Sequence, residues 1–348
     1  MMERILPKNR PAVLLAPMAG FTDRTFRLIC REFGADLVCT EMISAKGLLY
    51  RNDKSRALYD AKPGDEPFFV QLFGSDPDTV AKAAALIEQE LGEQLLGIDL
   101  NMGCPMPKIA GNGDGCALMQ NPLLAGKIVE QTVRAVHVPV TVKFRKGWDE
   151  AQQNAAEFAK VCEQSGACAL TIHGRTREQL YAGRADRVCM AEVKQSVQIP
   201  VFANGDVTNG QSALETLAET GCDGVMVGRA ALGDPFLFEE IRCALSGEAY
   251  TRPQPEQRRE IALRHARNAL EQKGPHAMIE LRKHLAFYAR GERGAAKLRV
   301  RINACRTLEE LEDIWPEHGL GADAAPETEF LGTQREKPAH DGENPVLT

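Results

Sequence analysis

Six polar residues stand at or close to the ends of short apolar runs. They are Gln71, Asn101, Lys143, His173, Asn204 and Arg229. Taken singly, each of them could be a hydrogen-bonded structural group. Six such residues at the same position relative to their runs instead indicate one polar, partly cationic pocket.

Cys104 is the candidate for proton chemistry. It follows an apolar run in the segment Asn-Met-Gly-Cys-Pro (101–105), where Gly and Pro restrict the backbone. A lone cysteine is more often a small buried hydrophobe, but this position favours a chemical role. A thiol with an ordinary pKa near ~8.5 is mostly protonated at neutral pH, so we predict a general acid. A nucleophile is the alternative, although no activating triad motif is evident.

Two glycine-containing segments predict a phosphate site. Asn204-Gly205-Asp206 and Gly228-Arg229 end the last two apolar runs, the second just before a helical segment. Glycine allows a close backbone approach, helix N-termini attract anions, and arginine binds phosphate oxygens in pairs. Each glycine alone would be interpreted as a simple turn. On this pattern alone, a phosphosugar fits as well as FMN.

Lys143 ends the apolar segment Val138–Phe144. A buried ammonium group is costly unless it is paired with something anionic. In a flavin site, this lysine would stabilise negative charge on the reduced ring. The alternative is a snorkelling or salt-bridged lysine at the rim of the fold.

Eight apolar, β-rich runs separated by amphipathic segments would have to position these side chains. The runs are Ala12–Met18, Asp36–Met42, Phe68–Gly74, Gly97–Asn101, Val138–Phe144, Cys168–Gly174, Pro200–Gly205 and Gly224–Arg229. Each suits a strand buried on both faces. Eight strand–helix units predict an α/β fold, a (β/α)₈ TIM barrel over residues 1–247, with its site at the carboxyl ends of the strands. A doubly wound sheet is the alternative, but no Gly-x-Gly-x-x-Gly follows the first run.

The pattern beyond residue 247 predicts two further parts. Residues 253–316 have the pattern of a small all-helical domain, with turns at Gly274-Pro275 and Gly291–Gly294. Residues 317–348 are acidic and poor in large apolar side chains, so we expect a disordered tail. Residues 252–306 hold fourteen Lys and Arg against five Asp and Glu, although the whole chain has a net charge of −6. Such a basic block is compatible with a nucleic-acid partner and also with a solvated surface.

The bulk composition limits the remaining possibilities. No apolar run approaches the ~20 residues of a membrane span, and the start lacks a signal-peptide core. Ten cysteines are present and none forms a Cys-x-x-Cys pair, which favours free thiols and no metal site. We therefore expect a soluble cytoplasmic protein. The sequence implies no protein partner, and we expect a monomer.

Several segments together resemble the tRNA-dihydrouridine synthases, most closely the bacterial DusB branch of that family. Besides residues 101–105, they are Ala16–Arg27, Thr40–Leu48, Val70–Asp78, Val142–Asp149, Thr171–Asp186, Phe202–Val207, Gly224–Phe238 and Arg282–Leu311. They occur in order over about 300 residues. Two departures are visible: Arg187 stands where many relatives have Trp, and the acidic tail is unfamiliar.

The resemblance implies a complete set of partners and roles. FMN would lie on Pro17, Met18, Ala19, Gln71, Lys143 and His173, with its phosphate on Asn204, Gly205, Asp206, Gly228 and Arg229. NADPH or NADH would supply hydride, and Cys104 would protonate carbon 5 of a uridine flipped out of tRNA. The candidate tRNA contacts are Asn101, Lys108, Arg175, Arg282, Lys283, Lys297, Arg299 and Arg301.

Two other classes of function compete with this one. An FMN barrel that reduces a small molecule explains the predicted phosphate site, but it has no use for the basic block. An RNA-binding protein with an inactive barrel explains the basic block, but it predicts loss of Lys143, Cys104 or Arg229, and all three are present. The predicted activity is therefore reduction of the C5–C6 bond of uridine in tRNA.

Overall fold

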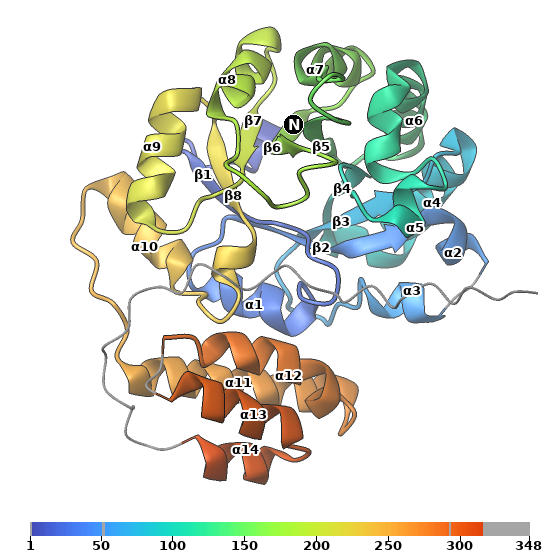
Figure 1. The fold of residues 1–348 in the computed structure, drawn as a ribbon. Helices are drawn as coiled ribbons and strands as arrows, with labels where there is room; N and C mark the ends of the chain where they lie inside the picture. The colour runs from blue at the N-terminus through green and yellow to red at the C-terminus, as the bar shows by residue number, and fades with distance from the viewer. Residues whose placement is uncertain (1, 51–52, 292–293, 316–348) are drawn as a thin grey trace, which may run out of the picture.

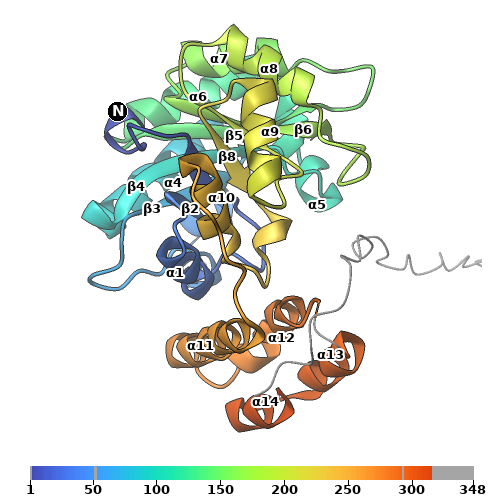
Figure 2. The ribbon, with the colours of Figure 1, turned by 90° about the vertical axis from the view of Figure 1, so that its left-hand side faces the viewer.

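The computed structural model describes residues 2–50, 53–291 and 294–315. The predicted tail, residues 317–348, lies outside the described residues. The described chain folds into a barrel followed by four helices that form a separate layer against one side of it (Figures 1 and 2).

Eight parallel strands close into one barrel in sequence order, which confirms the predicted fold (Figure 1). The strands are β1 Ala12–Leu15, β2 Leu37–Ser44, β3 Phe68–Phe73, β4 Leu95–Met102, β5 Val140–Gly147, β6 Ala169–Thr176, β7 Val201–Asn204 and β8 Gly224–Val227. Parallel strands at the centre of a barrel are covered on both faces, and β6 is buried at every position.

Several strand ends differ from the predicted ones. β5 continues to Gly147 and β6 to Thr176, so Arg145 and Arg175 lie within strands. The apolar pattern ends earlier because these arginines point into a polar barrel end where their charges have partners. β1 stops at Leu15 and β8 at Val227, which places residues 17–19 in a loop, Gly228 just after β8 and Arg229 at the start of a short 3-10 helix, Arg229–Ala231.

The outer layer of the barrel consists of helices between the strands. The longer ones are α1 Arg24–Glu32, α4 Pro77–Leu91, α6 Pro122–Ala135, α7 Ala155–Gln164, α8 Arg187–Ser196, α9 Gly210–Thr220 and α10 Leu237–Ser246; α2 Ala45–Leu49, α3 Asp53–Ala57 and α5 Pro107–Ala110 are short. Asp76 begins α4, because its side chain accepts a hydrogen bond from the backbone N–H of Thr79 and Pro77 follows it.

The last four helices are α11 Pro255–Lys273, α12 Ala277–Tyr288, α13 Ala295–Ala304 and α14 Leu308–Ile314. The predicted turn at Gly274-Pro275 lies between α11 and α12. The second predicted turn falls between α12 and α13, but residues 292 and 293 lie outside the described residues. A further break precedes α14, where Thr307 and Glu310 form a capping box that sequence reasoning did not identify. These helices share a second apolar core that also includes Ile29 and Phe236 of the barrel.

The helical layer is joined to the barrel by specific contacts. Lys273 of α11 donates to Asp23 (2.8 Å), the residue that caps α1, and Arg264 forms two hydrogen bonds with Glu32. The ring of Phe21 contacts His284 and Phe287 of α12, with centroids 5.0 and 5.7 Å away. The loop after β1 therefore lies between the barrel mouth and the helical layer.

Candidate active site

Cys104 lies in a loop that is fastened to the end of β4. Asn101 Oδ1 accepts hydrogen bonds from the backbone N–H groups of Gly103 (3.2 Å) and Cys104 (2.9 Å). Asn101 Nδ2 donates to Gln71 Oε1 at 2.8 Å, and Arg145 Nε donates to Gly103 O at 2.9 Å. Three of the predicted site residues, from β3, β4 and the loop, are thus in one hydrogen-bonded group.

The Cys104 thiol is half-buried beside cations. Burial raises its pKa above the ordinary value; the backbone N–H of Met106 and the charges of Arg145 and Lys143 lower it by less. The net rise keeps the thiol protonated at neutral pH. This is the state that a general acid needs.

Lys143 lies in the barrel interior, and its Nζ donates to Asn204 Oδ1 at 2.9 Å. Asn204 Nδ2 in turn donates to Met226 O at 2.8 Å, so the Asn204 side chain orients the lysine. Burial, followed by the repulsion of Arg145, lowers the pKa of Lys143 to about 8. The pocket thus holds an ammonium group whose charge an anion would stabilise.

His173 is surrounded by positive charge. Burial lowers its pKa well below the ordinary value, and the cations Lys143, Arg145, Arg175 and Arg229 lower it further. The imidazole is therefore neutral at physiological pH. Four cations around one neutral ring indicate a pocket suited to a negatively charged ligand.

Arg175 belongs to the wall of this pocket, which corrects its prediction as a tRNA contact. Its side chain is only 2% exposed, so a folded RNA cannot reach it. Nη2 donates to both carboxylate oxygens of Asp206 (2.7 and 2.8 Å) and to Gly183 O. Nη1 is buried and has no hydrogen-bond partner among the described residues. A Cβ atom placed on Gly205 would lie 3.5 Å from this Nη1.

The same contacts revise the role predicted for Asp206. Its carboxylate binds Arg175 and also accepts from the backbone N–H of Ala185 at 2.7 Å. A carboxylate repels phosphate, so only the backbone of Asp206 is available to such a ligand. Gly205 has φ +127°, a conformation that favours glycine, and a Cβ there would lie 2.6 Å from that of Ala185. Glycine is therefore required at this point in the wall of the pocket.

Arg229 follows β8 and stacks on an aromatic ring at the mouth. Its guanidinium carbon lies 4.4 Å from the ring centroid of Tyr181, and that of Arg145 lies 5.9 Å from the same centroid. Arg145 also donates to the carbonyl oxygens of Thr176 and Leu180, which hold the loop carrying Tyr181. Neither Arg145 nor Tyr181 was predicted. The alternation of side chains along β5 places Arg145 on the same face as Lys143, and that signal could have identified it.

The remaining predicted tRNA contacts differ in exposure. Asn101 belongs to the hydrogen-bonded group around Cys104 described above, and Arg299 on α13 is half-buried. Four are exposed: Lys108 on α5, Lys283 on α12, and Lys297 and Arg301 on α13. Arg282 is half-buried and donates twice to Cys305 O (2.8 and 3.1 Å), so it holds α12 to the turn before α14.

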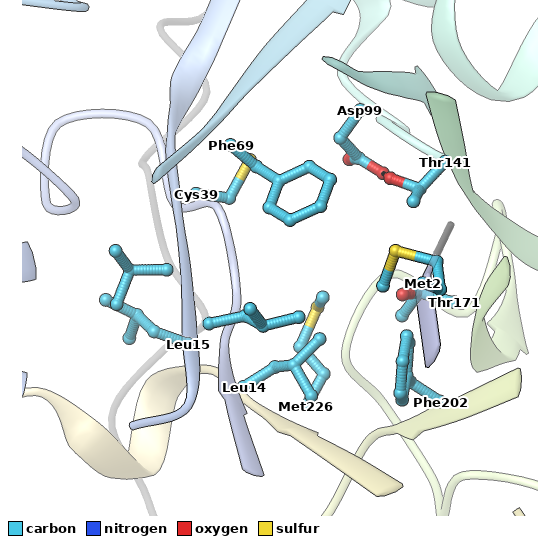
Figure 3. Close-up of a pocket in the computed structure, with 12 residues that line it drawn as sticks. Met2, Leu14, Leu15, Cys39, Phe69, Asp99, Thr141, Thr171, Phe202 and Met226 are labelled. Carbon is cyan, nitrogen blue, oxygen red and sulfur yellow. Dashed lines mark hydrogen bonds between the residues drawn. The ribbon is translucent and has the colours of Figure 1, made fainter. Parts of the chain in front are cut away.

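A small cavity lies deeper in the barrel, below the polar groups (Figure 3). Its volume is about 30 Å³, and its lining includes Leu14, Phe69, Asp99, Thr141 and Thr171. Such a space holds about one water molecule. The candidate site is therefore the cationic mouth above this cavity.

Three further features of the described residues concern membrane-spanning helices, metal-binding clusters and disulfides. None of its helices is long and apolar enough to cross a membrane. Within the same residues, no group of three or more His, Cys, Asp and Glu side chains is arranged to hold a metal ion. The ten cysteines are all free thiols.

The fold and the site together define a (β/α)₈ barrel enzyme with a cationic pocket and a half-buried thiol at the carboxyl ends of its strands. A family model for dihydrouridine synthases (Dus) matches residues 14–320. This chain therefore belongs to the dihydrouridine synthase family.

Individual relatives support this assignment and the resemblance to the B branch. tRNA-dihydrouridine synthase B of Pseudomonas putida is 42% identical over 299 residues, covering 85% of this chain and 87% of the relative. The protein of the same name from Pseudomonas aeruginosa is 42% identical over 304 residues, 86% and 90% of the two chains. A probable tRNA-dihydrouridine synthase of Rickettsia bellii is 41% identical over 294 residues, 84% and 89% of the two chains.

Proposed function

We propose that this enzyme reduces the C5–C6 double bond of uridine in tRNA to give 5,6-dihydrouridine, using FMN and NADPH. The observation that carries the proposal is the half-buried Cys104 thiol, held beside the cationic mouth of the barrel in a chain of the dihydrouridine synthase family. The names of the relatives supply tRNA as the substrate.

The residues of the pocket fit FMN. The buried Arg175 Nη1 has no partner among the described residues and lies beside Gly205, which makes it a donor ready for a phosphate oxygen. We propose that Arg175 joins Gly205, Gly228 and Arg229 around the phosphate. The ring would lie against Pro17, Met18, Ala19, Gln71, Lys143 and His173. When bound, reduced FMN would supply the hydride for carbon 6 of the uracil, with NADPH or NADH as the external reductant.

The protein itself supplies the proton. The Cys104 thiol is proposed to protonate carbon 5 of the uracil, because burial keeps it protonated near neutral pH. Asn101 holds the loop at the correct place through two backbone N–H groups. A uridine stacked within tRNA cannot enter a barrel mouth, so the base must first leave its stack.

Exposed basic residues are proposed to bind the tRNA backbone. Lys108 lies on α5, four residues beyond Cys104, and Lys283 lies where α12 packs against the loop after β1. Lys297 and Arg301 belong to the basic block and share a face of α13. Together they would extend the cationic surface from the mouth to the helical layer.

The decisive experiment measures product in tRNA. The purified protein, FMN and NADPH are incubated with tRNA made without modifications, and dihydrouridine is measured by mass spectrometry of the nucleosides. We expect wild-type protein to form dihydrouridine and Cys104→Ala to form much less. If FMN binds and NADPH is oxidised but no tRNA preparation yields dihydrouridine, the enzyme acts on another substrate and the proposal is wrong.

A further inference from the structure

A chain of hydrogen bonds runs from the barrel interior to the Cys104 loop. Thr141 Oγ1 donates to Asp99 Oδ1 at 2.6 Å, and Gln71 Nε2 donates to Asp99 Oδ2 at 2.6 Å. Gln71 Oε1 accepts from Asn101 Nδ2 at 2.8 Å, and Asn101 Oδ1 accepts from Cys104 N at 2.9 Å. We refer to Thr141, Asp99, Gln71, Asn101 and the Cys104 backbone as the β4 relay.

The direction of every bond in the β4 relay follows from its outer end. The backbone N–H groups of Gly103 and Cys104 can only donate, so Asn101 must turn its oxygen toward the loop. Its amide nitrogen then faces Gln71, whose oxygen must accept. The nitrogen of Gln71 is therefore left to face Asp99, which must accept in turn. An ionised carboxylate, which only accepts, completes the relay without conflict.

The inner end of the relay is buried. Asp99 is 5% exposed, and its carboxylate faces the Thr141 hydroxyl at the edge of the cavity (Figure 3). Burial raises the pKa of Asp99, while the hydrogen bonds from Thr141 and Gln71 and the charge of Lys143 oppose the rise. Buried carboxylates are kept in proteins only where such partners compensate for lost hydration. Asp99 therefore has a role that an apolar residue of similar size could not fill.

We propose that Asp99 is a positioning residue: by accepting from Gln71, it holds the Gln71 and Asn101 amides in the orientation that the Cys104 loop requires and thereby fixes that loop. An amide can rotate by 180° and exchange donor for acceptor. The backbone N–H groups at the outer end and the carboxylate at the inner end require the same orientation, and without the carboxylate nothing holds the Gln71 nitrogen at the inner end. The role of Cys104 as an acid rests on the function proposed above. The placement of its loop by Asp99 does not depend on that function.

Two substitutions at position 99 separate this role from simple packing. In Asp99→Asn, the amide oxygen can still accept from Gln71, and the amide nitrogen can donate to the Thr141 hydroxyl, which accepts as well as donates. The β4 relay is then preserved. In Asp99→Leu, the side chain has a similar size but no acceptor, so Gln71 Nε2 is left unpaired and both amides lose the inner contact that holds them in place.

The test is the rate at which iodoacetamide alkylates Cys104 in the full-length protein, measured by peptide mass spectrometry without tRNA or NADPH. In Asp99→Leu, the freed loop should expose the thiol and lower its pKa, which raises the rate roughly tenfold for each pKa unit. In Asp99→Asn, the rate should stay within about threefold of wild type, since the relay is retained. Turnover on tRNA should fall by roughly 10² in Asp99→Leu with little change in KM, because a general acid is misplaced.

Matched controls show whether the effect is specific. Thr171 lines the same cavity but is not part of the β4 relay, so Thr171→Val should leave the Cys104 rate unchanged. The alkylation rate of Cys243, a partly exposed thiol on α10, reports whether each variant is folded. Should Asp99→Leu fail to fold, Thr141→Val removes one donor to Asp99 and should shift the Cys104 rate in the same direction by less.

Three results would overturn the proposal. They are a Cys104 rate in Asp99→Leu equal to that in Thr171→Val, equal rates in Asp99→Leu and Asp99→Asn, and no shift in the substitute variant Thr141→Val. Alkylation requires no substrate, so it tests the β4 relay even if the wild-type protein does not act on tRNA. In that case the positioning role would stand and the proposed function would fall.

Discussion

At the residue scale, burial and nearby cations act on the Cys104 thiol in opposite directions, and burial has the larger effect. A raised pKa fits the proposed role of this thiol as an acid and does not favour an activated nucleophile. For Lys143, burial lowers the pKa, and the repulsion of Arg145 lowers it further. Both effects depend on neighbours that the barrel brings together.

Removing the Cys104 thiol should slow the reaction without affecting the cofactor. In Cys104→Ala, dihydrouridine formation should fall by roughly 10²–10⁴, the range for loss of a positioned general acid. FMN retention and NADPH oxidation should stay near wild type, and Cys243→Ala, at a thiol on α10, is the matched control. An unchanged rate on tRNA would mean that another group supplies the proton.

Removing the Arg229 guanidinium should weaken FMN binding. A hydrogen bond to a charged group contributes about 1.5–3 kcal/mol, so Arg229→Ala should raise the Kd of FMN by roughly tenfold to a hundredfold. Fluorescence titration of the apoprotein measures this change. Arg184→Ala, at an exposed arginine in the same loop as Tyr181, should bind FMN as wild type does. Equal Kd values for the two variants would remove Arg229 from the phosphate site.

Lys143 should make binding of reduced FMN dependent on pH. Only the protonated lysine stabilises negative charge, and its pKa in the free protein is lowered to about 8. The affinity for reduced FMN should therefore fall as pH rises through this value, with a limiting slope of about tenfold per pH unit. Anaerobic titration between about pH 7 and 9 measures it. Lys143→Met should show no such slope, and a flat wild-type profile would contradict the assignment.

At the element scale, both the carboxyl ends of the strands and the loops after them supply side chains to the candidate site. β5 supplies Lys143 and Arg145, and the loop after β6 carries Tyr181. In α13, the spacing of the basic residues along one helix decides which of them can bind tRNA phosphate groups together. Lys297 and Arg301, four residues apart, are exposed, whereas Arg299 is half-buried. Burial lowers the pKa of Arg290, and the charge of Arg299 lowers it further.

The exposed face of α13 should contribute to tRNA affinity by binding phosphate groups. In Lys297→Ala with Arg301→Ala, the salt dependence of tRNA binding should become shallower by roughly 0.7–0.9 for each phosphate that is no longer bound. The double variant Lys127→Ala with Lys160→Ala, on α6 and α7, removes the same charge from the outer barrel. Titrations at several salt concentrations compare the two. If both double variants have the same salt slope, the face of α13 is only solvated.

At the scale of the whole molecule, the helical layer is packed against the loop that leads into the site. His265 and His284 are buried there beside Phe21 and Phe26. His265 Nε2 and His284 Nδ1 have no hydrogen-bond partners among the residues described. Burial lowers the pKa of His265 to about 4, against the attraction of Asp23, and that of His284 well below the ordinary value.

This interface should lose stability in mild acid. The unfolded chain binds protons on these histidines below about pH 6.5, whereas folded His265 stays neutral down to about pH 4. Stability is therefore complete above the unfolded pKa and falls as pH drops, by on the order of 2 kcal/mol from His265 at pH 5. His265→Phe should reduce the difference in Tm between pH 7 and 5. His276→Gln, at an exposed histidine, should keep it, and equal shifts would refute the idea.

Local sequence patterns determined the fold and the general position of the site. Apolar runs of strand length separated by amphipathic segments have few arrangements other than a barrel, and polar residues at their carboxyl ends must then share one rim. Cys104, Lys143, His173 and Arg229 were located in this way. The spacing of Lys297 and Arg301 likewise decided that they share a face of a helix. These conclusions depend only on neighbours along the chain.

Only the tertiary structure decided which atoms meet. Arg175 and Asp206 are 31 residues apart, Asp99 and Thr141 are 42 apart, and Arg282 reaches the Cys305 carbonyl across 23 residues. Such pairs form only when the barrel closes or the helices pack. For this reason Arg175 was taken for an RNA-binding residue, the contact of Arg282 with the Cys305 carbonyl was not foreseen, and Asp99 was missed. A sequence pattern shows which face a side chain occupies, but its hydrogen-bond partner comes from another strand or helix.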